Sequence, residues 1–508
     1  MKEQLALLPG YLVAHLQLTL VALTLGVGLS VPLGIALSRS RRLEAPVLAV
    51  ASIIQTIPSL ALLAFMVPAL AALGLKSIGF APAIVGLFLY SVLPILRNTV
   101  AGLAAVDPAL REAARGVGMT PGEQLRRVEL PLAMPVIVAG IRTSAVWTVG
   151  TATLSTPVGA PSLGNYIFSG LQTRNYTAVL VGCIAAAALA LLLDTLVRAL
   201  EAGIRRRSRA LVGTSLAALG ALGVIAAGSF VASAAAARSE GDRISIGAKT
   251  FTEQYILSRI LAGAIARETG LPTEAVDSLG STVAFDALRN GQIDGYVEYT
   301  GTLWTTIMKR SEIPGDRAAL LREVDDYLRA EHGIVVAAAL GFENTYTIAV
   351  RRADATRLAL RTVGDLAPHL GAMSLGGDYE IFQRPEWRSL QRAYGLAPRE
   401  QRSMDPSLMY EAIRARQVDA ITAFSTDGRL VSYDLQALDD DRHAIPPYDA
   451  IVLVSARTAR EHGDVVTALR GLAGSIDADR MRRMNAAVDE QGDTPATVAE
   501  RFLRERLP

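Results

Sequence analysis

The stretch EAARGVGMTPGEQLRRVELP, residues 112–131, decides how this chain of 508 residues is interpreted. It is rich in charge, although the segments on both sides of it are strongly apolar. Glu112 is expected to begin a short helix that ends near Gly118, because glycine readily adopts the left-handed conformation of a helix C-cap. A charged helix between apolar segments indicates a loop that does more than connect them.

A second short helix is expected to follow directly. Thr120 is a typical N-cap and Pro121 suits the first helical position, where its missing N–H costs nothing. One face of this helix is apolar and the other is basic, and the helix is predicted to end at Leu130 and Pro131. Two short amphipathic helices at an angle to each other predict a segment that docks into a groove on another protein.

The spacing within residues 112–131 resembles the cytoplasmic coupling loop of bacterial ABC importer permeases. The pattern is Glu-Ala-Ala, three residues, Gly, nine residues, an aliphatic residue, one residue and Leu-Pro, with Val128 where isoleucine is commoner. The alternative is an ordinary connecting loop. The resemblance implies docking to a separate ATP-binding subunit through Glu112, Ala113, Ala114, Gly118, Leu130 and Pro131.

Apolar runs long enough to cross a membrane occur throughout the first part of the chain, since a spanning helix needs about 20 mostly apolar residues. They predict an all-α polytopic membrane domain with six helices, at roughly 12–37, 47–73, 80–96, 132–156, 178–197 and 210–231.

Basic residues cluster in alternate loops between these runs, as in the loops around residues 39–42, 97–127 and 205–209. Short basic loops stay in the cytoplasm. The first residues and everything after about residue 232 are therefore expected outside, and the loop at 112–131 inside. This predicts a multi-pass protein of the bacterial inner membrane.

Charge divides the chain into two parts. Residues 1–239 hold 18 Lys and Arg against 8 Asp and Glu, whereas residues 240–508 hold 32 against 40. We expect a permease domain at 1–209, a sixth span or tether at 210–240, and an extracytoplasmic domain at 241–508. Residues 210–240 also have the pattern of a signal peptide, and an uncleaved anchor is favoured because the apolar core is long.

Several functions find no support in the sequence. A single cysteine excludes an intrachain disulfide, and the five histidines show no metal-ligand spacing. Without a phosphate-binding glycine loop, the chain is not expected to hydrolyse ATP. No cofactor, metal, covalent chemistry or nucleic-acid partner is predicted.

The second part of the chain alternates short apolar runs with helical patterns, which predicts an α/β domain. Strands are expected at 244–249, 345–351 and 450–456, and the last two would cross between two lobes. The prediction is a type II two-lobed binding domain. Its first lobe would hold about 241–350 and 450–508, and its second about 351–449.

Five motifs in this part together resemble the substrate-binding proteins of osmoprotectant importers, which take up glycine betaine, choline, carnitine and related quaternary ammonium compounds. The motifs are GAKTFTEQ, DGYVEYTGT, ENTYTIAVR, AFSTDGRL and DDDRHAIPPY. The resemblance covers nearly all of residues 243–508. It implies that permease and binding protein are fused here.

A quaternary ammonium has no N–H to donate, so aromatic faces hold it, each contributing about 0.5–2 kcal/mol. The resemblance implies a cage and donors to the ligand's polar tail. The cage would consist of Tyr299, Tyr346, Phe424 and Tyr448, with Gln254 and Thr302 as the donors. Phe424 departs from the family, which commonly has tyrosine there.

The expected protein is thus an ABC importer subunit for quaternary ammonium osmoprotectants, a homodimer in the bilayer with a separate ATP-binding homodimer. Two alternatives stay open. One is an importer of ergothioneine, another betaine-like solute or a small amino acid. The other is a ligand-gated receptor with a tethered binding domain, which would have no use for an ATPase-docking loop.

Overall fold

The structure is a computed structural model that describes residues 2–173, 175–239, 243–310, 317–378 and 381–506. The chain separates into two compact units, which consist mainly of residues 1–168 with 176–241 and of residues 242–508. The domain boundary expected at 240/241 lies outside the described residues. Each unit is described by itself.

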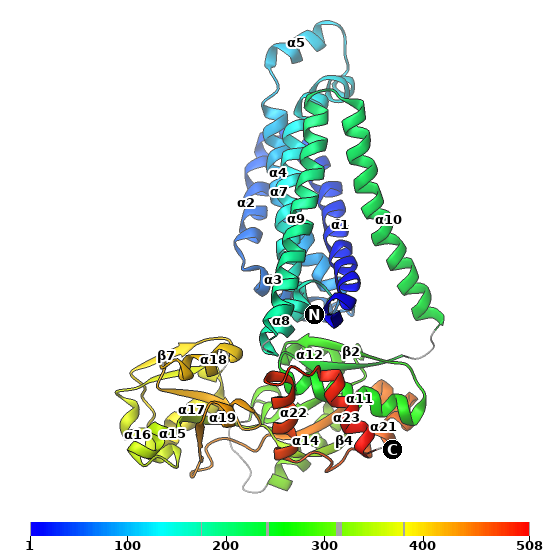
Figure 1. Cartoon of the computed structure of the whole chain (residues 1–508). Coiled ribbons are helices and arrows are strands. Elements are labelled where there is room, and N and C mark those ends of the chain that lie inside the picture. Colours follow the sequence, from blue (N-terminus) through cyan, green and yellow to red (C-terminus); the bar gives the residue numbers. More distant parts are fainter. Residues whose placement is uncertain (1, 174, 240–242, 311–316, 379–380, 507–508) are drawn as a thin grey trace. The chain divides into compact units, whose positions relative to one another are not determined.

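The first unit is helical, and α1, α4, α7 and α9 pack in that order along one another (Figure 1). Its elements are α1 (Lys2–Ser38), α2 (Arg41–Thr56), α3 (Ser59–Ala72), α4 (Phe80–Ala104), α5 (Pro108–Gly116), α6 (Pro121–Gln124), η1 (Leu125–Glu129), α7 (Leu130–Ala152), η2 (Thr153–Val158), α8 (Gly164–Gln172), α9 (Tyr176–Arg205) and α10 (Arg209–Ser239).

Five of these helices are long and apolar enough to cross a membrane, and α2 with α3 forms a sixth candidate that is bent by 99°. The bend falls at Pro58, which follows the end of α2 and cannot supply the N–H that would continue it. The expected all-α polytopic fold is confirmed. The second candidate consists of two helices at an angle, where a single run from 47 to 73 was expected.

Several polar side chains inside the bundle are paired with groups of neighbouring helices, which lowers the cost of placing them in a bilayer. Buried His15 of α1 contacts Val149 O of α7 at 3.0 Å through Nε2, and its Nδ1 accepts the Leu163 N–H at 3.3 Å. Arg142 of α7 pairs with Asp194 of α9 at 2.8 Å. These contacts tie α1, α7 and α9 together.

The second unit contains two five-stranded sheets, with orders β2-β1-β3-β10-β4 and β7-β6-β8-β5-β9. The strands are β1 (Ile244–Lys249), β2 (Thr273–Leu279), β3 (Gly295–Tyr299), β4 (Val335–Glu343), β5 (Tyr346–Arg351), β6 (Ser374–Gly377), β7 (Glu400–Ser403), β8 (Ala420–Phe424), β9 (Leu435–Leu438) and β10 (Asp449–Val454). The expected α/β two-lobed fold is confirmed.

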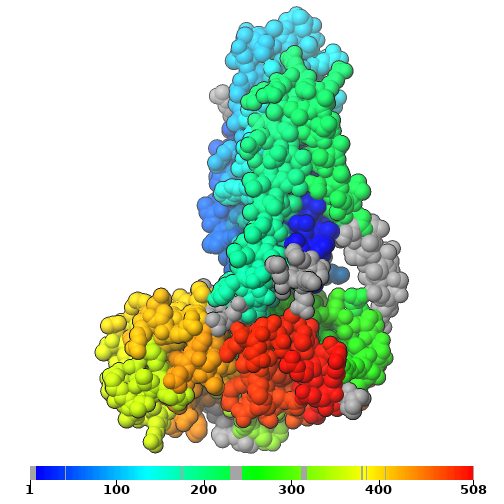
Figure 2. All heavy atoms as spheres, in the orientation of Figure 1, coloured from blue at the N-terminus to red at the C-terminus, as the bar shows by residue number. Residues whose placement is uncertain are grey.

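Helices cover the two sheets, and the second lobe, yellow to orange in Figure 2, lies beside the red C-terminal helices of the first. These helices are α11 (Thr252–Thr269), α12 (Ser281–Arg289), α13 (Thr300–Thr302), η3 (Leu303–Ile307), α14 (Arg317–His332), α15 (Arg352–Leu358), α16 (Val363–Leu370), η4 (Ile381–Gln383), α17 (Pro385–Tyr394), α18 (Pro406–Arg414), α19 (Arg429–Ser432), α20 (Ala456–Glu461), α21 (Gly463–Arg470), α22 (Ala478–Asp489) and α23 (Pro495–Arg506).

The chain crosses between the lobes at two segments, 343–346 and 438–449. β5 belongs to the second sheet, where it pairs antiparallel with β8 and β9. The first crossing therefore precedes β5, slightly earlier than the expected lobe boundary near residue 350. β10 returns to the first sheet between β3 and β4. The two crossing segments form the hinge.

Candidate functional site

Aromatic side chains from both lobes and from the hinge meet in one hydrophobic cluster. Tyr299 ends β3 in the first lobe, Phe424 ends β8 in the second, and Tyr346 and Tyr448 belong to the crossing segments. Phe251, which precedes α11, is the fifth ring of this group. The rings of Phe251, Tyr299, Tyr346, Phe424 and Tyr448 are called the aromatic box below.

Neighbouring rings of the aromatic box pack close to one another. Phe251 stacks on Tyr299 at 6.3 Å and lies parallel to Phe424 at 6.4 Å between centroids. Tyr346 is 5.1 Å from Phe424 and meets Tyr448 edge to face at 6.2 Å. The four aromatic residues proposed from the sequence are thus brought together, whereas the sequence argument missed Phe251.

Local chain geometry places these rings. Tyr346 and Phe424 are direct partners in the β5–β8 pair, so their side chains lie on one face of the sheet. Gly301 lies against the Tyr448 ring, and a Cβ at this position would come within 2.4 Å of that ring. The glycine of the motif EYTGT therefore has a physical role, since any side chain there would displace Tyr448.

The Tyr299 hydroxyl donates to a buried carboxylate, that of Glu253. Glu253 also accepts from Asn344 Nδ2 at 3.0 Å, Thr426 Oγ1 at 2.6 Å and Asn485 Nδ2 at 3.2 Å. Burial raises the pKa of Glu253 above its usual value, although the hydrogen bonds from its four partners oppose the shift. Glu253 links the box to the hinge and to α22.

The other two hydroxyls of the box also donate to buried carboxylates. Tyr346 donates to Asp378 Oδ2 at 3.0 Å, and Tyr448 donates to Glu386 Oε1. Burial first, and then Glu386, hold the pKa of Tyr448 well above its usual value, so this hydroxyl remains a donor. Glu386 Oε1 also accepts from Thr305 Oγ1 at 2.9 Å.

The two proposed polar donors are buried, and Gln254 contacts the box directly. Gln254 Nε2 donates to Val297 O at 3.0 Å and to Tyr299 Oη at 3.1 Å, and its Oε1 accepts the Lys249 N–H. Its amide thus positions Tyr299 within the protein. Thr302 ends α13, beside Gly301. Contact of either side chain with a ligand stays a prediction.

Two cationic side chains lie over rings of the box. Lys249 Nζ is 4.9 Å from the Tyr299 centroid and pairs with buried Glu298. Arg384 Cζ is 5.7 Å from the Tyr346 centroid. The guanidinium of Arg384 thus places a positive charge beside the rings of the box.

Sequence reasoning missed Phe251, Glu253, Arg384 and Glu386. Phe251 and Glu253 lie within the motif GAKTFTEQ beside Gln254, so their position was a usable signal. Arg384 and Glu386 lie in a segment that has none of the quoted motifs, and only the fold brings them to the box. No cluster of three possible metal ligands occurs in the part of the chain that the structure describes.

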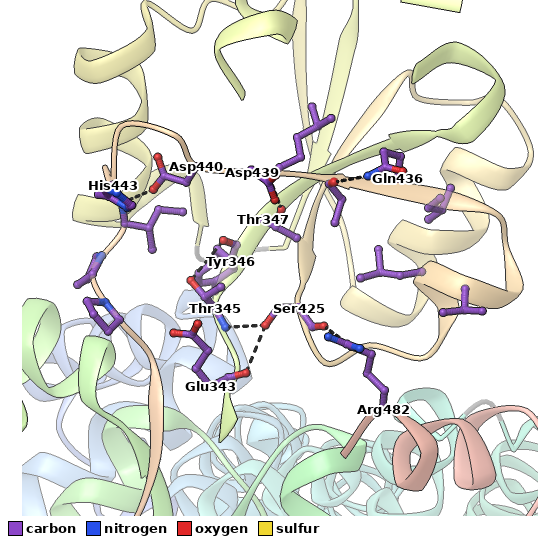
Figure 3. Close-up of a pocket in the computed structure, with 18 of the residues that line it drawn as sticks. Glu343, Thr345, Tyr346, Thr347, Ser425, Gln436, Asp439, Asp440, His443 and Arg482 are labelled. Atoms are coloured by element: carbon purple, nitrogen blue, oxygen red, sulfur yellow. Dashed lines mark hydrogen bonds between the residues drawn. The ribbon is translucent and has the colours of Figure 1, made fainter. Parts of the chain in front are cut away.

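A pocket of about 530 Å³ opens at the hinge, with walls from both crossing segments and both lobes. Figure 3 shows Thr345 beside Ser425 there, and the Thr345 N–H donates to Ser425 Oγ at 3.0 Å. Arg482 of α22 donates to Ser425 O at 3.2 Å. These contacts link the second lobe to the first at the hinge, and Tyr346 lines both the pocket and the box.

The coupling segment forms two short helices, as expected, at one end of the helical unit (Figure 1). Gly118 has φ +80°, and Met119 N–H donates to Ala114 O at 3.1 Å, which closes the end of α5. Thr120 and Glu123 form a capping box. Val117 is 73% exposed, so an apolar side chain is presented at the surface of this loop.

Two expectations for this segment were wrong. α5 begins at Pro108 with Asp107 as its N-cap, before Glu112. The second helix does not end at Leu130 and Pro131, because η1 continues it directly into α7. In η1 the Leu130 N–H donates to Leu125 O, and this wider turn precedes Pro131, which lacks an N–H. The coupling segment is therefore continuous with a membrane span.

Comparisons with known proteins agree with the folds of both units of the chain. Residues 242–505 match the family model of the substrate binding domain of ABC-type glycine betaine transport systems. Residues 26–206 match the model of the binding-protein-dependent transport system inner membrane component. The chain belongs to the family of binding-protein-dependent ABC transport systems.

Relatives within this family resemble all or part of the chain. The Helicobacter pylori ergothioneine transport permease/ergothioneine binding protein EgtU is 30% identical over 94% of this chain and 86% of its own length. The Bacillus subtilis choline transport system permease protein OpuBB is 47% identical over 35% of this chain and 80% of its own length. A solved structure titled as a glycine betaine/carnitine/choline ABC transporter covers 52% of this chain and 98% of its own, with 32% identity and a TM-score of 0.46.

The chain therefore joins the permease and the substrate-binding component of an ABC importer in one polypeptide. It is a non-catalytic transport subunit with a multi-pass membrane domain. It acts together with a separate ATP-binding subunit and transports a small-molecule substrate.

Proposed function

We propose that the chain imports quaternary ammonium solutes such as glycine betaine, choline or carnitine, which bind in the aromatic box. The observation that carries the proposal is the convergence of five rings from both lobes and the hinge. Ring faces attract a cation that cannot donate hydrogen bonds, by about 0.5–2 kcal/mol for each contact. Closure of the lobes would bring these faces around the ligand.

The charges near the box support a zwitterionic ligand. Arg384, over the Tyr346 ring, offers a carboxylate a partner, while the rings hold the ammonium group. Gln254 and Thr302 are proposed to contact the polar tail. Phe424 keeps an aromatic face but has no hydroxyl, which limits hydrogen bonding on that wall.

Ergothioneine is the second candidate. It is also a trimethylated betaine, so the box would hold its ammonium group in the same way. What favours it is the Helicobacter pylori relative named for ergothioneine transport, in which the match extends over 94% of this chain and so includes both domains. Another betaine-like or amino-acid solute is a less supported alternative.

We propose a homodimer of this chain in the bacterial inner membrane, with an ATP-binding homodimer on the cytoplasmic side. The proposed coupling residues are Glu112, Ala113, Ala114, Gly118, Leu130 and Pro131. The exposed loop and its direct continuation into α7 support this assignment, because a force on the loop would reach a span without a flexible joint. Residues 1–209, 210–240 and 241–508 are proposed as permease, sixth span and extracytoplasmic domain.

Isothermal titration calorimetry of the full chain in lipid nanodiscs tests the proposal, with glycine betaine, choline, carnitine, ergothioneine and proline as titrants. We expect saturable binding of at least one trimethylammonium compound and none of proline, which has no methylated nitrogen. Binding of proline alone, or of none of the trimethylammonium compounds, would overturn the proposed function. A ligand-gated receptor would bind ligand but would not stimulate the hydrolysis of ATP by the partner subunit.

A further inference from the structure

Each tyrosine of the aromatic box donates its hydroxyl to a different buried carboxylate. The pairs are Tyr299 with Glu253, Tyr346 with Asp378 and Tyr448 with Glu386. The carboxylates come from α11, from the loop after β6 and from α17, so no single element supplies them. A layer of acidic groups thus contacts the outer edges of the rings that would surround a ligand.

This layer has electrostatic consequences for the rings. A hydroxyl that donates to a carboxylate is polarised, which moves electron density toward the ring. The ring face is the negative end of the quadrupole that attracts cations, so added electron density strengthens this attraction. The carboxylate charge itself also acts across the ring in a region with little water.

Charges nearby offset part of this layer. Lys249 is paired with Glu298, and Arg384 places one cation over Tyr346. Glu386, in contrast, makes no ion pair within the described ranges, and its buried Oε2 has no hydrogen-bond partner there. Its charge is therefore less compensated than that of an ion-paired carboxylate would be.

We propose that Glu386, with Asp378 and Glu253, acts through the ring hydroxyls of the box to select a permanently cationic ligand over an uncharged one of the same shape. None of the three has to touch the ligand. The inference rests on the proposed function, since it takes a quaternary ammonium group as the occupant of the box. It adds residues that affect ligand specificity through the ring hydroxyls, without contact with the ligand.

Glu386→Gln separates charge from position. Tyr448 and Thr305 both donate to Oε1 of Glu386, and the glutamine carbonyl can accept both hydrogen bonds. The variant thus removes the charge and leaves the anchor of Tyr448. Glu386→Asp is the matched control, because it keeps the charge while it shortens the side chain.

The probes are choline and 3,3-dimethylbutan-1-ol, in which a carbon atom replaces the charged nitrogen. Calorimetry on the full chain in nanodiscs should show choline affinity about five- to tenfold weaker in Glu386→Gln, with less than about a twofold change for the alcohol. Glu386→Asp should keep the wild-type ratio of the two affinities, even if both affinities fall. Should Glu386→Gln fail to fold, Asp378→Asn is tested in the same way.

An equal loss for both probes, or no loss for either, would overturn the inference and leave the proposed function intact, because a residue that only positions Tyr448 affects both probes alike. If the wild-type protein binds neither choline nor any other trimethylammonium compound, the proposed function fails, and the inference fails with it.

Discussion

The carboxylate of Glu129 lies 3.7 Å from the guanidinium of Arg39, which follows the end of α1. Glu129 also pairs with Arg111 of α5 at 3.4 Å and accepts from Gln124 Nε2 of α6 at 2.8 Å. Arg39 in turn donates to Pro121 O at 3.3 Å. One side chain at the end of η1 thus joins both short helices of the coupling segment to the first span.

Glu129→Gln should weaken the transmission of motion from the ATP-binding subunit. We expect a severalfold lower rate of ligand uptake in proteoliposomes, because partly exposed ion pairs each contribute only about 0.2–1 kcal/mol. Calorimetric affinity for the ligand should be unchanged. Glu44→Gln in α2 is the control. A loss of ligand affinity together with uptake would argue against a role confined to coupling.

Gly118→Ala should impair coupling through backbone strain alone. Gly118 has φ +80°, and a Cβ there would meet no atom within 4 Å. A non-glycine residue in this conformation costs about 1–2 kcal/mol, so the turn between α5 and α6 should rearrange. Ligand-stimulated ATP hydrolysis by the assembled transporter measures the effect. Gly116→Ala, also with nothing within 4 Å but without a positive φ, should retain activity.

Tyr448→Ala should weaken ligand binding about 30- to 150-fold, because it removes a ring face and buried area together. Calorimetry on the full chain measures the change. Tyr327→Ala in α14, outside the box, is the control and should bind as the wild type does. If the two variants bind equally well, Tyr448 is not a wall of the ligand site.

Asp489→Asn should change how stability depends on pH. Burial, with a contribution from Asp427, raises the pKa of Asp489 to about 7, although Arg429 opposes the shift. The folded state then keeps a proton that the unfolded chain releases near pH 4, so this residue's stabilisation is lost as pH rises from about 4 to about 7.

Thermal unfolding of the full chain at pH 5 and pH 8, followed by tryptophan fluorescence, tests this. The melting temperature of Asp489→Asn minus that of the wild type should be about 2–4 °C larger at pH 8 than at pH 5. Its carbonyl can still accept from Thr252, which donates to Asp489 Oδ1 at 2.6 Å. Asp326→Asn, at an exposed position, is the control and should shift the melting temperature equally at pH 5 and pH 8. An equal shift at both pH values in Asp489→Asn would mean that Asp489 is already ionised at pH 5.

Topology is tested by reporter fusions. A fluorescent protein fused after Arg209 should be active in the cytoplasm, and alkaline phosphatase fused after Glu240 should be active outside. The physical reason is the alternation of basic loops, which stay on the cytoplasmic side. Both reporters active on one side of the membrane would mean that residues 210–240 do not cross it.

Local patterns in the sequence were sufficient for most of the architecture. Apolar runs placed the spans, because a bilayer requires about 20 apolar residues wherever a helix crosses it. Thr120, Pro121 and Gly118 placed the caps of the coupling segment, since capping depends on a few neighbouring residues. The continuation through η1 was missed, and so was the bend at Pro58, although proline is itself a local signal for a break in a helix.

For the binding site, the sequence by itself determined which motifs carry aromatic residues, and their resemblance to osmoprotectant-binding proteins singled out Tyr299, Tyr346, Phe424 and Tyr448. Only the tertiary structure decided that Phe251 joins them and that a carboxylate lies behind each tyrosine. The physical reason is that each carboxylate lies far along the chain from the tyrosine it contacts, with separations of 46, 32 and 62 residues. Their charges matter only because folding buries them, away from water, against the hydroxyls of the same box.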